Sequence, residues 1–178
     1  MEDAERRIVT DEWFRAYSSR VLAYLLHRTD PQTAQDVLQE VFVTAFGKAE
    51  EITESPLGWL FGAARRLLAN RYRGFRRHDE LIARLMDDAS LAADSDEIEL
   101  KQAFAHTLAS LPAGDREVLT LTGWYDLTPA QAAQALGCNP ATYAVKLHRA
   151  RKRLAAALDA AGYRGSSPAG QLAAALRG

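Results

Sequence analysis

The sequence predicts an all-α protein of two small helical bundles, with an acidic linker between them and a helix-turn-helix in the second bundle. Apolar residues recur at three- and four-residue spacing, and the few β-branched residues fall inside these helical periods, so strand signals are absent. Charge is uneven: residues 78–99 hold eight acidic side chains and one basic one, whereas the net charge is +1 before this segment and +5 after it. We therefore expect one domain at 1–77, a linker at 78–99, a second domain at 100–160 and a tail at 161–178.

Composition limits the classes of protein that the chain can represent. With 178 residues, 48% hydrophobic and 25% charged, it can build one ordinary domain or two small ones. No apolar run approaches the roughly 20 residues that span a bilayer, and the N-terminus is charged where a signal peptide is apolar. A single cysteine, Cys138, and four histidines without ligand spacing argue against a disulfide framework and a metal site. We expect a cytoplasmic protein with no cofactor, no metal and no membrane contact of its own.

The first bundle begins with two predicted helices. The first is expected from about Asp11 to Arg28, and Asp30 with Pro31 starts the second. The apolar positions expected to pack in the core of the first helix are Trp13, Phe14, Tyr17, Val21, Tyr24 and Leu25. Those of the second helix are Ala34, Val37, Leu38, Val41, Phe42 and Ala45.

Three polar residues share the opposite side of the second helix: Asp36, Gln39 and Glu40 lie within about a quarter turn of one another. Such side chains match donors on another protein, although by pattern alone a solvated face is the stronger interpretation. Paired carboxylates also serve acid–base catalysis, but no adjacent His, Lys, glycine loop or metal set accompanies these. The pattern leaves a partner surface and a solvated face open and disfavours an enzyme.

A third helix is expected to begin at Ser55 and Pro56. Its buried face is predicted to contain Leu57, Leu60, Phe61, Ala64 and Leu68. Nearly opposite, an aromatic ring, an amide and two guanidinium groups share one stripe, made of Trp59, Arg66, Asn70 and Arg73. This composition suits single-stranded nucleic acid, since a ring stacks on an unpaired base and cations contact the backbone. A half-buried tryptophan beside solvated arginines explains the stripe equally well.

The second bundle is predicted to begin with two helices: the first contains Leu100, Phe104, Leu108 and Leu111, and the second begins at Pro112. A helix, a tight turn and another helix are then expected between Thr128 and Leu158. The signals for the two last helix starts and for their turn are, in order, Thr128, Pro129, Gln131, Gly137, Asn139 and Pro140. Such a sequence is typical of a helix-turn-helix.

The last of these helices carries two neighbouring stripes. The apolar stripe consists of Tyr143, Leu147, Ala150, Leu154 and Leu158. About 100° around the axis lies a second stripe with three cations, made of Thr142, Lys146, Arg149 and Arg153. Its length suits the major groove, with cations on phosphates and the N-terminal residues facing base edges. The alternative is a solvated basic face, but the capped first helix and the glycine turn favour DNA binding.

Four segments, taken in order, resemble the extracytoplasmic-function sigma factors of bacterial RNA polymerase. They are AQDVLQEVF at 34–42, WL at 59–60 followed by RRLLANRYRGFRR, LPAGDREVLTL at 111–121, and KLHRARKRL at 146–154. The resemblance covers almost the whole chain, from about Trp13 to Leu158. Each motif alone is weak, but four in this order with a linker of suitable length are specific.

The resemblance implies a subunit that binds core RNA polymerase and directs promoter recognition and opening without catalysing a reaction. It places the polymerase contact on Asp36, Gln39 and Glu40, and it implies an anti-sigma protein as an inhibitory partner. The residues that it assigns to the minus-ten element of promoter DNA are Glu51, Ser55, Trp59, Arg65, Arg66, Asn70, Arg71 and Arg73. Those that it assigns to the minus-thirty-five element are Thr142, Val145, Lys146, His148, Arg149, Lys152 and Arg153.

The chain departs from the family pattern at a few positions. Arg66 stands where the family usually has asparagine, and Ala144 and Val145 replace a cation and a hydroxyl of the recognition helix; Val145 suits a thymine methyl instead. The linker is interpreted as a solvated spacer, with mimicry of nucleic-acid charge as the alternative. The tail is either a disordered extension or a short helix containing Leu172 and Leu176. The competing function is a stand-alone helix-turn-helix regulator, which would bind its operator without polymerase.

Overall fold

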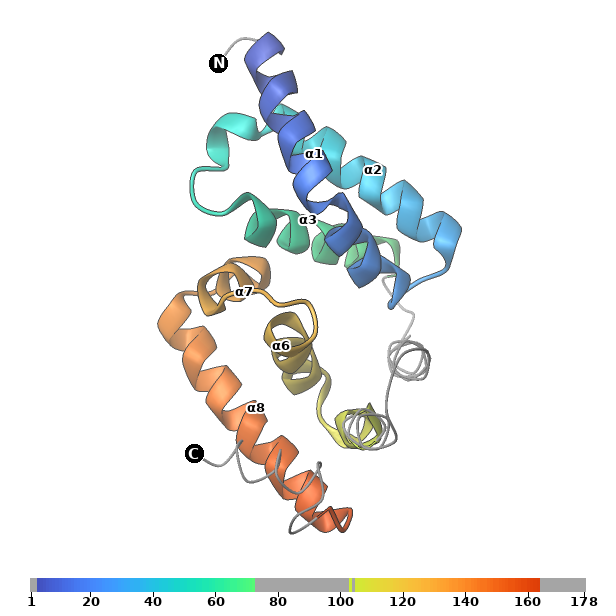
Figure 1. Cartoon of the computed structure of the whole chain (residues 1–178), viewed down its shortest axis with the longest axis vertical. Coiled ribbons are helices and arrows are strands. Elements are labelled where there is room, and N and C mark those ends of the chain that lie inside the picture. Colours follow the sequence, from blue (N-terminus) through green and yellow to red (C-terminus); the bar gives the residue numbers. More distant parts are fainter. Residues whose placement is uncertain (1–2, 73–102, 104, 164–178) are drawn as a thin grey trace. The chain divides into compact units, whose positions relative to one another are not determined.

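The computed structural model describes residues 3–72, 103 and 105–163, which form helices joined by short turns, with no strand among them (Figure 1). This confirms the predicted all-α class. The described residues form two compact units: the first combines residues up to Tyr72 with Tyr125–Tyr143, and the second combines residues 103–124 with residues 144–163. The predicted domain boundaries remain a prediction, since packing does not show which segments act separately. The acidic linker, Arg73, Leu100, Phe104 and the tail from residue 164 lie outside the described residues.

The first unit contains α1 (Asp3–Leu26), α2 (Pro31–Gly47), the 3-10 turn η1 (Ala49–Glu51), α3 (Pro56–Arg71) and α7 (Pro129–Leu136) (Figure 1). Helix α1 begins at Asp3, so the predicted start near Asp11 was wrong. Two acidic residues, Asp3 and Glu5, occupy its first turn, where carboxylates interact favourably with the helix dipole. The Nη2 atom of Arg6 also lies 2.7 Å from Oε1 of Glu50, which ties this extra length to η1.

The predicted start of α2 is confirmed. Oδ1 of Asp30 accepts a hydrogen bond from the Thr33 N–H at 2.9 Å, and Pro31 occupies the first turn, where no N–H partner is required. Because this bond favours the ionised carboxylate, it lowers the pKa of Asp30 to about 2. Helix α3 begins at Pro56 as predicted, but the Ser55 hydroxyl does not cap it.

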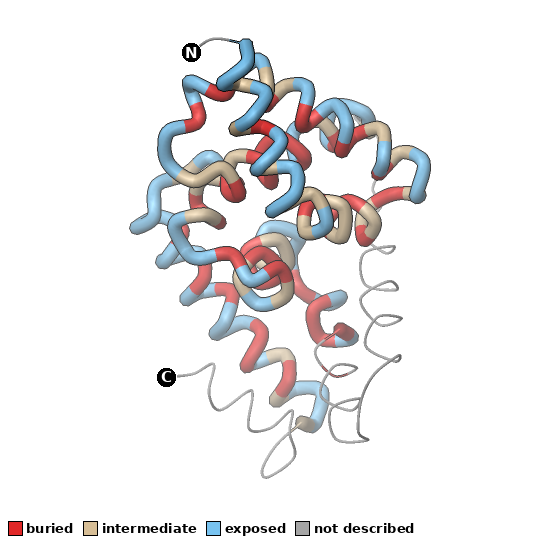
Figure 2. Tube along the Cα trace, turned by 45° about the horizontal axis from the view of Figure 1, so that its top comes forward, coloured by how far each residue is buried: buried red, intermediate tan, exposed pale blue. Residues whose placement is uncertain are grey.

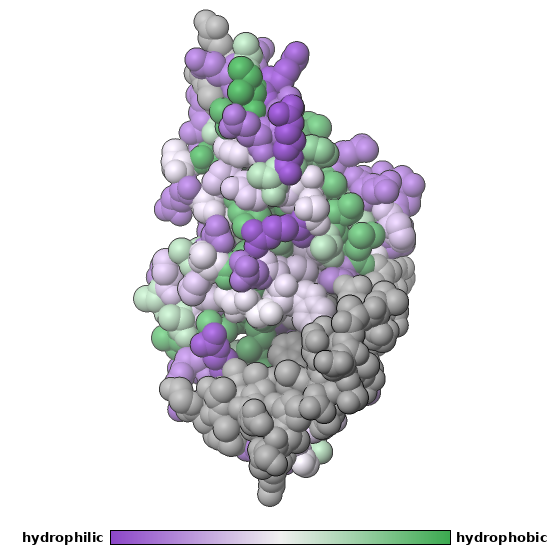
Figure 3. All heavy atoms as spheres, in the orientation of Figure 1, coloured by the Kyte–Doolittle hydropathy of each residue, from purple (hydrophilic) through white to green (hydrophobic). Residues whose placement is uncertain are grey.

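The core of the first unit lies along the inner faces of α1, α2 and α3 (Figure 2). The apolar faces predicted for α2 and α3 are buried, and so are Val21, Tyr24 and Leu25 of α1. Phe14, which was predicted to be in the core, is instead 47% exposed and packs edge-on against Phe42 with ring centroids 4.9 Å apart. Figure 3 shows hydrophobic groups among hydrophilic ones over the N-terminal part of α1.

Tyr125, just before α7, completes this core and is 6% exposed. Its ring centroid lies 5.3 Å from that of Tyr24 and 5.8 Å from that of Phe61. Its hydroxyl accepts a hydrogen bond from Nη1 of Arg28 at 2.8 Å and lies 2.8 Å from Nδ1 of His27. A buried tyrosine needs such partners for its hydroxyl, so the position is specified by both packing and hydrogen bonding.

Helix α7 rests directly on the backbone of α3. A Cβ atom added at Gly58 would lie 2.8 Å from the carbonyl oxygen of Gln131, and one added at Gly62 would lie 3.3 Å from Cα of Ala135. The Ser55 hydroxyl accepts a hydrogen bond from Nε2 of Gln131 at 3.2 Å beside this contact. Because glycine has no side chain, α3 presents a second packed face that holds no large apolar residue.

The predicted helix-turn-helix is present. The Thr128 hydroxyl accepts a hydrogen bond from the Gln131 N–H at 3.3 Å, and Oε1 of Gln131 accepts one from the Thr128 N–H at 3.0 Å, which completes a capping box. Gly137 ends α7 in the left-handed conformation, with φ 67° and ψ 35°. Oδ1 of Asn139 then accepts a hydrogen bond at 2.7 Å from the N–H three residues on and caps α8 (Pro140–Ala160).

The second unit contains α6 (Ala113–Gly123), which begins after Pro112 as predicted, together with helical residues at 105–110 and most of α8. Val118, Leu119 and Leu121 of α6 are buried. The apolar stripe of α8 is buried along its whole length: Tyr143, Leu147, Ala150, Leu154 and Leu158. A helix with one buried face is thereby fixed in rotation about its axis, and its polar residues are directed outward.

Candidate interaction surfaces

Helix α8 presents a basic row beside its buried stripe. This row consists of Thr142, Lys146, Arg149 and Arg153. Every residue predicted to contact the minus-thirty-five element is exposed: Thr142, Val145, Lys146, His148, Arg149, Lys152 and Arg153. Nη1 of Arg153 lies 2.6 Å from Oδ2 of Asp115 on α6, so the C-terminal end of the row is tied to the helix beneath it. Val145 is 51% exposed and adds an apolar group near the N-terminal end. The row is accessible to a polyanion along about three helical turns.

The outward face of α2 carries the three residues predicted to contact polymerase. Asp36 is half-buried, and Gln39 and Glu40 are exposed. Val43 lies one turn further along the same face, at three- and four-residue spacing from the last two, and is 72% exposed. Val43 was not predicted to belong to this surface, although an apolar residue at an outward position of the helical period indicates a contact. These four residues are called the α2 face below.

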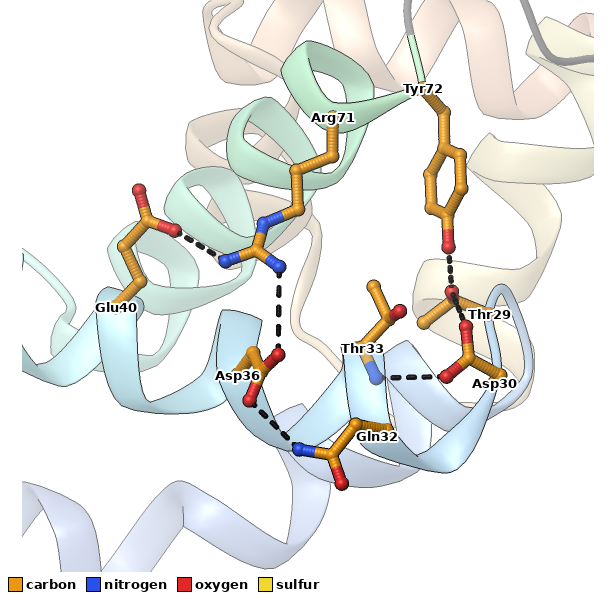
Figure 4. A network of polar contacts seen from close by, with 8 residues as sticks. All are labelled: Thr29, Asp30, Gln32, Thr33, Asp36, Glu40, Arg71 and Tyr72. Carbon is orange, nitrogen blue, oxygen red and sulfur yellow. Dashed lines mark hydrogen bonds and ion pairs between the residues drawn. The ribbon is translucent and has the colours of Figure 1, made fainter.

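Arg71, predicted to contact DNA, lies against this α2 face (Figure 4). Its Nη2 atom lies 3.1 Å from Oε2 of Glu40, and its Nη1 atom lies 3.9 Å from Oδ2 of Asp36. Oδ1 of Asp36 accepts a hydrogen bond from Nε2 of Gln32 at 3.1 Å. The structure thus brings together residues that were assigned to two different partners.

The remaining α3 residues assigned to DNA differ in exposure, and the half-buried Trp59 matches the alternative interpretation of the stripe. Arg65, Arg66 and Asn70 are exposed, and Trp59 is half-buried. A Cβ atom at Gly62 would lie 3.3 Å from Nη1 of Arg66, so this guanidinium folds back over its own helix. The stripe can still offer an aromatic ring, an amide and cations on one side of α3.

The segment before α3, which holds Glu51, is anchored on its N-terminal side. Oε2 of Glu51 lies 3.0 Å from Nζ of Lys48, and the Arg6 guanidinium contacts Glu50. The hydrogen bond from Arg6 lowers the pKa of the Glu50 carboxyl to about 2, because it stabilises the ionised form. Glu50 is therefore occupied within the chain, while the neighbouring Glu51 is exposed.

Among the described residues, no three His, Cys, Asp or Glu side chains are grouped so as to hold a metal ion. Within the same residues, no helix combines the length and the apolar character needed to cross a membrane.

Comparison with known proteins agrees with the all-α fold. Residues 13–78 match the family described as Sigma-70 region 2, and residues 101–154 match Sigma-70, region 4. The ECF RNA polymerase sigma factor SigM of Bacillus subtilis (strain 168) is 30% identical over 152 residues, which cover 82% of this chain and 93% of SigM.

Two solved structures share the fold. CnrH, solved in complex with the cytosolic domain of CnrY, matches with a TM-score of 0.59 at 24% identity, over 89% of this chain and 95% of CnrH. The sigma factor RpoE from Bartonella quintana, solved with the anti-sigma factor NepR, matches with a TM-score of 0.56 at 21% identity, over 84% and 96% of the two chains. With both sigma-70 regions in order and SigM matched over nearly its whole length, the chain belongs to the extracytoplasmic-function RNA polymerase sigma factors.

Proposed function

We propose that this sigma factor binds core RNA polymerase through the α2 face, reads duplex promoter DNA with the basic row of α8 and contacts the opened minus-ten strand with α3. It directs transcription initiation by positioning the polymerase, and it acts where the polymerase is, in the bacterial cytoplasm. The observation that carries the proposal is the division of α8 into a buried apolar stripe and an exposed basic row. A helix fixed in this way can lie in the major groove with its cations toward phosphates.

The decisive experiment combines the purified protein with core polymerase and a library of promoters. Specific run-off transcripts are the expected result. A stand-alone regulator would instead give a footprint from the protein alone and no polymerase-dependent transcript, which would contradict the proposal.

The polymerase contact is tested by replacing Asp36 and Gln39 together with alanine. A few hot-spot residues at the centre of an interface dominate its affinity, and we expect Asp36 and Gln39 to include one, so core binding should fall by at least about tenfold. The matched control is Asp11→Ala with Glu12→Ala, which truncates two exposed polar side chains on α1. Equal core affinity for both double variants would remove the assignment of the α2 face, provided that circular dichroism shows intact helices.

The duplex contact is tested by Arg149→Ala in the holoenzyme, with binding to promoter duplex measured over a range of salt concentrations. Loss of one phosphate contact lowers the slope of log K against log salt by about 1. Arg151→Ala is the matched control, because Arg151 is also exposed but lies about 200° around α8 from Arg149. An unchanged slope for Arg149→Ala would contradict groove contact.

We further propose that an anti-sigma protein inhibits this chain by covering the same helices. RpoE from Bartonella quintana was solved with such a protein, NepR. An inhibitor of this kind competes with the polymerase for the α2 face, so raising the core polymerase concentration should restore transcription. Inhibition that core polymerase cannot relieve would contradict competition.

A further inference from the structure

We propose that Asp36 and Glu40 form a guanidinium-binding site that Arg71 fills in the free chain, and that an arginine of the polymerase replaces Arg71 there on binding. The displaced Arg71 then becomes available to a phosphate of the opened promoter strand. This inference rests on the proposed use of the α2 face as the polymerase contact.

The geometry shows what kind of group the site accepts. The two carboxylates lie one helical turn apart on α2, and a single guanidinium reaches both with different nitrogens: Nη2 to Glu40 at 3.1 Å and Nη1 to Asp36 at 3.9 Å (Figure 4). The contact with Glu40 is a hydrogen bond, and the longer one with Asp36 is an ion pair only. The wide guanidinium can serve both carboxylates at once because its charge and donors are spread over a planar fork, whereas the ammonium of lysine is a compact point charge. The occupant inside the chain therefore identifies arginine as the matching group on a partner.

The exchange requires no movement of the backbone. Arg71 is the last residue of α3, and the next residue, Tyr72, donates its N–H to the carbonyl oxygen of Leu68 at 3.1 Å. The Tyr72 hydroxyl is hydrogen-bonded to that of Thr29, and the Thr29 hydroxyl also donates to Oδ2 of Asp30 at 3.3 Å (Figure 4). The end of α3 is thus held to the start of α2 independently of Arg71, whose long side chain can leave while its Cα stays in place.

The contact is weak enough to be exchanged. The Arg71 side chain is 39% exposed, and those of Asp36 and Glu40 are each 46% exposed. Ion pairs with this much solvent contribute little, so Arg71 can reduce the affinity of a competing arginine by at most about fivefold. Water reaches all three groups, and each charge remains solvated during the exchange.

The exchange couples two binding events. Arg71 lies on the same helix as the exposed Arg65, Arg66 and Asn70, so its release adds a cation to the surface proposed for the minus-ten strand. A polymerase arginine that draws Asp36 and Glu40 away from Arg71 thereby favours binding of single-stranded DNA, and thermodynamic linkage requires the reverse effect to be equally large.

The test uses Arg71→Ala in the full chain and measures two affinities. Removing the internal competitor should tighten binding to core polymerase by up to about fivefold. In the resulting holoenzyme, affinity for promoter DNA with a pre-opened minus-ten segment should fall, with a salt slope lower by about 0.7, the value for one contact to a single strand. Arg15→Ala, which removes an exposed charge from α1, is the matched control and should leave core affinity unchanged.

The predicted gain in core affinity and loss in DNA affinity distinguish the exchange from a purely structural role of Arg71. If Arg71 only stabilised the fold or held the carboxylates in place, the alanine variant would bind core polymerase less tightly or equally, and either result overturns the exchange. Tighter core binding with unaltered DNA binding overturns the release of Arg71 to the strand. Failure of the proposed function itself would appear differently, as core affinity that Asp36→Ala with Gln39→Ala does not change.

Discussion

Helices α3 and α8 both carry exposed arginines, but α8 buries one face and α3 buries two. On α8 the buried residues follow the apolar stripe, and the remaining positions are largely free to carry charge. On α3 one buried face holds large apolar residues, whereas the other is made by Gly58 and Gly62 against α7. Helical periodicity reports the first kind of face and not the second, because glycine carries no hydropathy signal that marks burial.

The number of buried faces also determines how the cations of each helix are arranged. On α8 the sector left exposed is broad enough for a continuous row, in which Arg153 alone is paired in the described part of the chain. On α3 the exposed sector is narrow, so Arg66 folds over Gly62 and Arg71 turns toward α2. We infer that α8 is suited to a permanent polyanion contact, and α3 to one that changes with its partners.

The largest predicted loss of stability tests whether α8 buries only one face. Leu154 is 1% exposed, so Leu154→Ala should lower the free energy of unfolding by about 2–5 kcal/mol, measured by urea denaturation. Arg151→Ala, on the exposed side of the same helix, should change it by less than about 0.5 kcal/mol. Comparable losses in the two variants would show that α8 is not one-sided.

A smaller effect tests the second face of α3. In Gly58→Ala the new Cβ meets the backbone of Gln131 at 2.8 Å and forces α7 outward, so we expect a loss of about 1–2 kcal/mol despite the better helix propensity of alanine. At Gly114 of α6 a Cβ meets nothing within 4 Å, and Gly114→Ala should be neutral or slightly stabilising. If both variants are neutral in urea denaturation, α7 does not pack tightly on α3.

The smallest effect distinguishes the caps of the two regions by pH. Asp30 caps α2, and its pKa is lowered from 3.8 to about 2, so its carboxylate binds protons less readily in the folded protein than in the unfolded chain. Its contribution to the stability of the fold is therefore present above about pH 4 and is lost as the pH falls toward 2. Thr128 and Asn139, which cap α7 and α8, do not titrate. Asp30→Asn keeps a good cap, so the acid-induced loss of stability between pH 4 and 2 should become shallower.

The opposite substitution, at the cap of α8, makes this test more specific. Asn139→Asp should add the same kind of acid sensitivity to the start of α8, measured as the slope of unfolding free energy against pH. An unchanged slope in both variants would contradict the capping assignments.

Sequence reasoning recovered what depends on local chemistry. The capping box of Thr128, the left-handed Gly137 and the buried stripe of α8 follow from signals within a few residues of each position. It failed where distant residues decide the structure. Nothing near Tyr125 indicates that it packs against Tyr24, and nothing near Arg71 indicates that it contacts Glu40.

The candidate site shows the same division. The sector that carries Asp36, Gln39 and Glu40 was predictable from the helical period, and these residues do lie on one face. Their ion pairs were not predictable, because an exposed side chain has several rotamers and its partner comes from another helix. Phe14 was misplaced for a related reason: it follows the helical period, but it lies at the margin of the core against Phe42 and stays 47% exposed, whereas Thr10, one turn earlier, is buried.

The discontinuous first unit has a consequence during synthesis. Its first three helices leave the ribosome well before Tyr125–Tyr143, and at about 5–20 residues per second the interval is several seconds. Throughout that time the aromatic rings of Tyr24 and Phe61 lack Tyr125, and the glycine face of α3 lacks α7. During this interval the nascent chain therefore exposes apolar surface that is buried in the folded protein. Chaperones, or nascent chains on adjacent ribosomes, can bind to it.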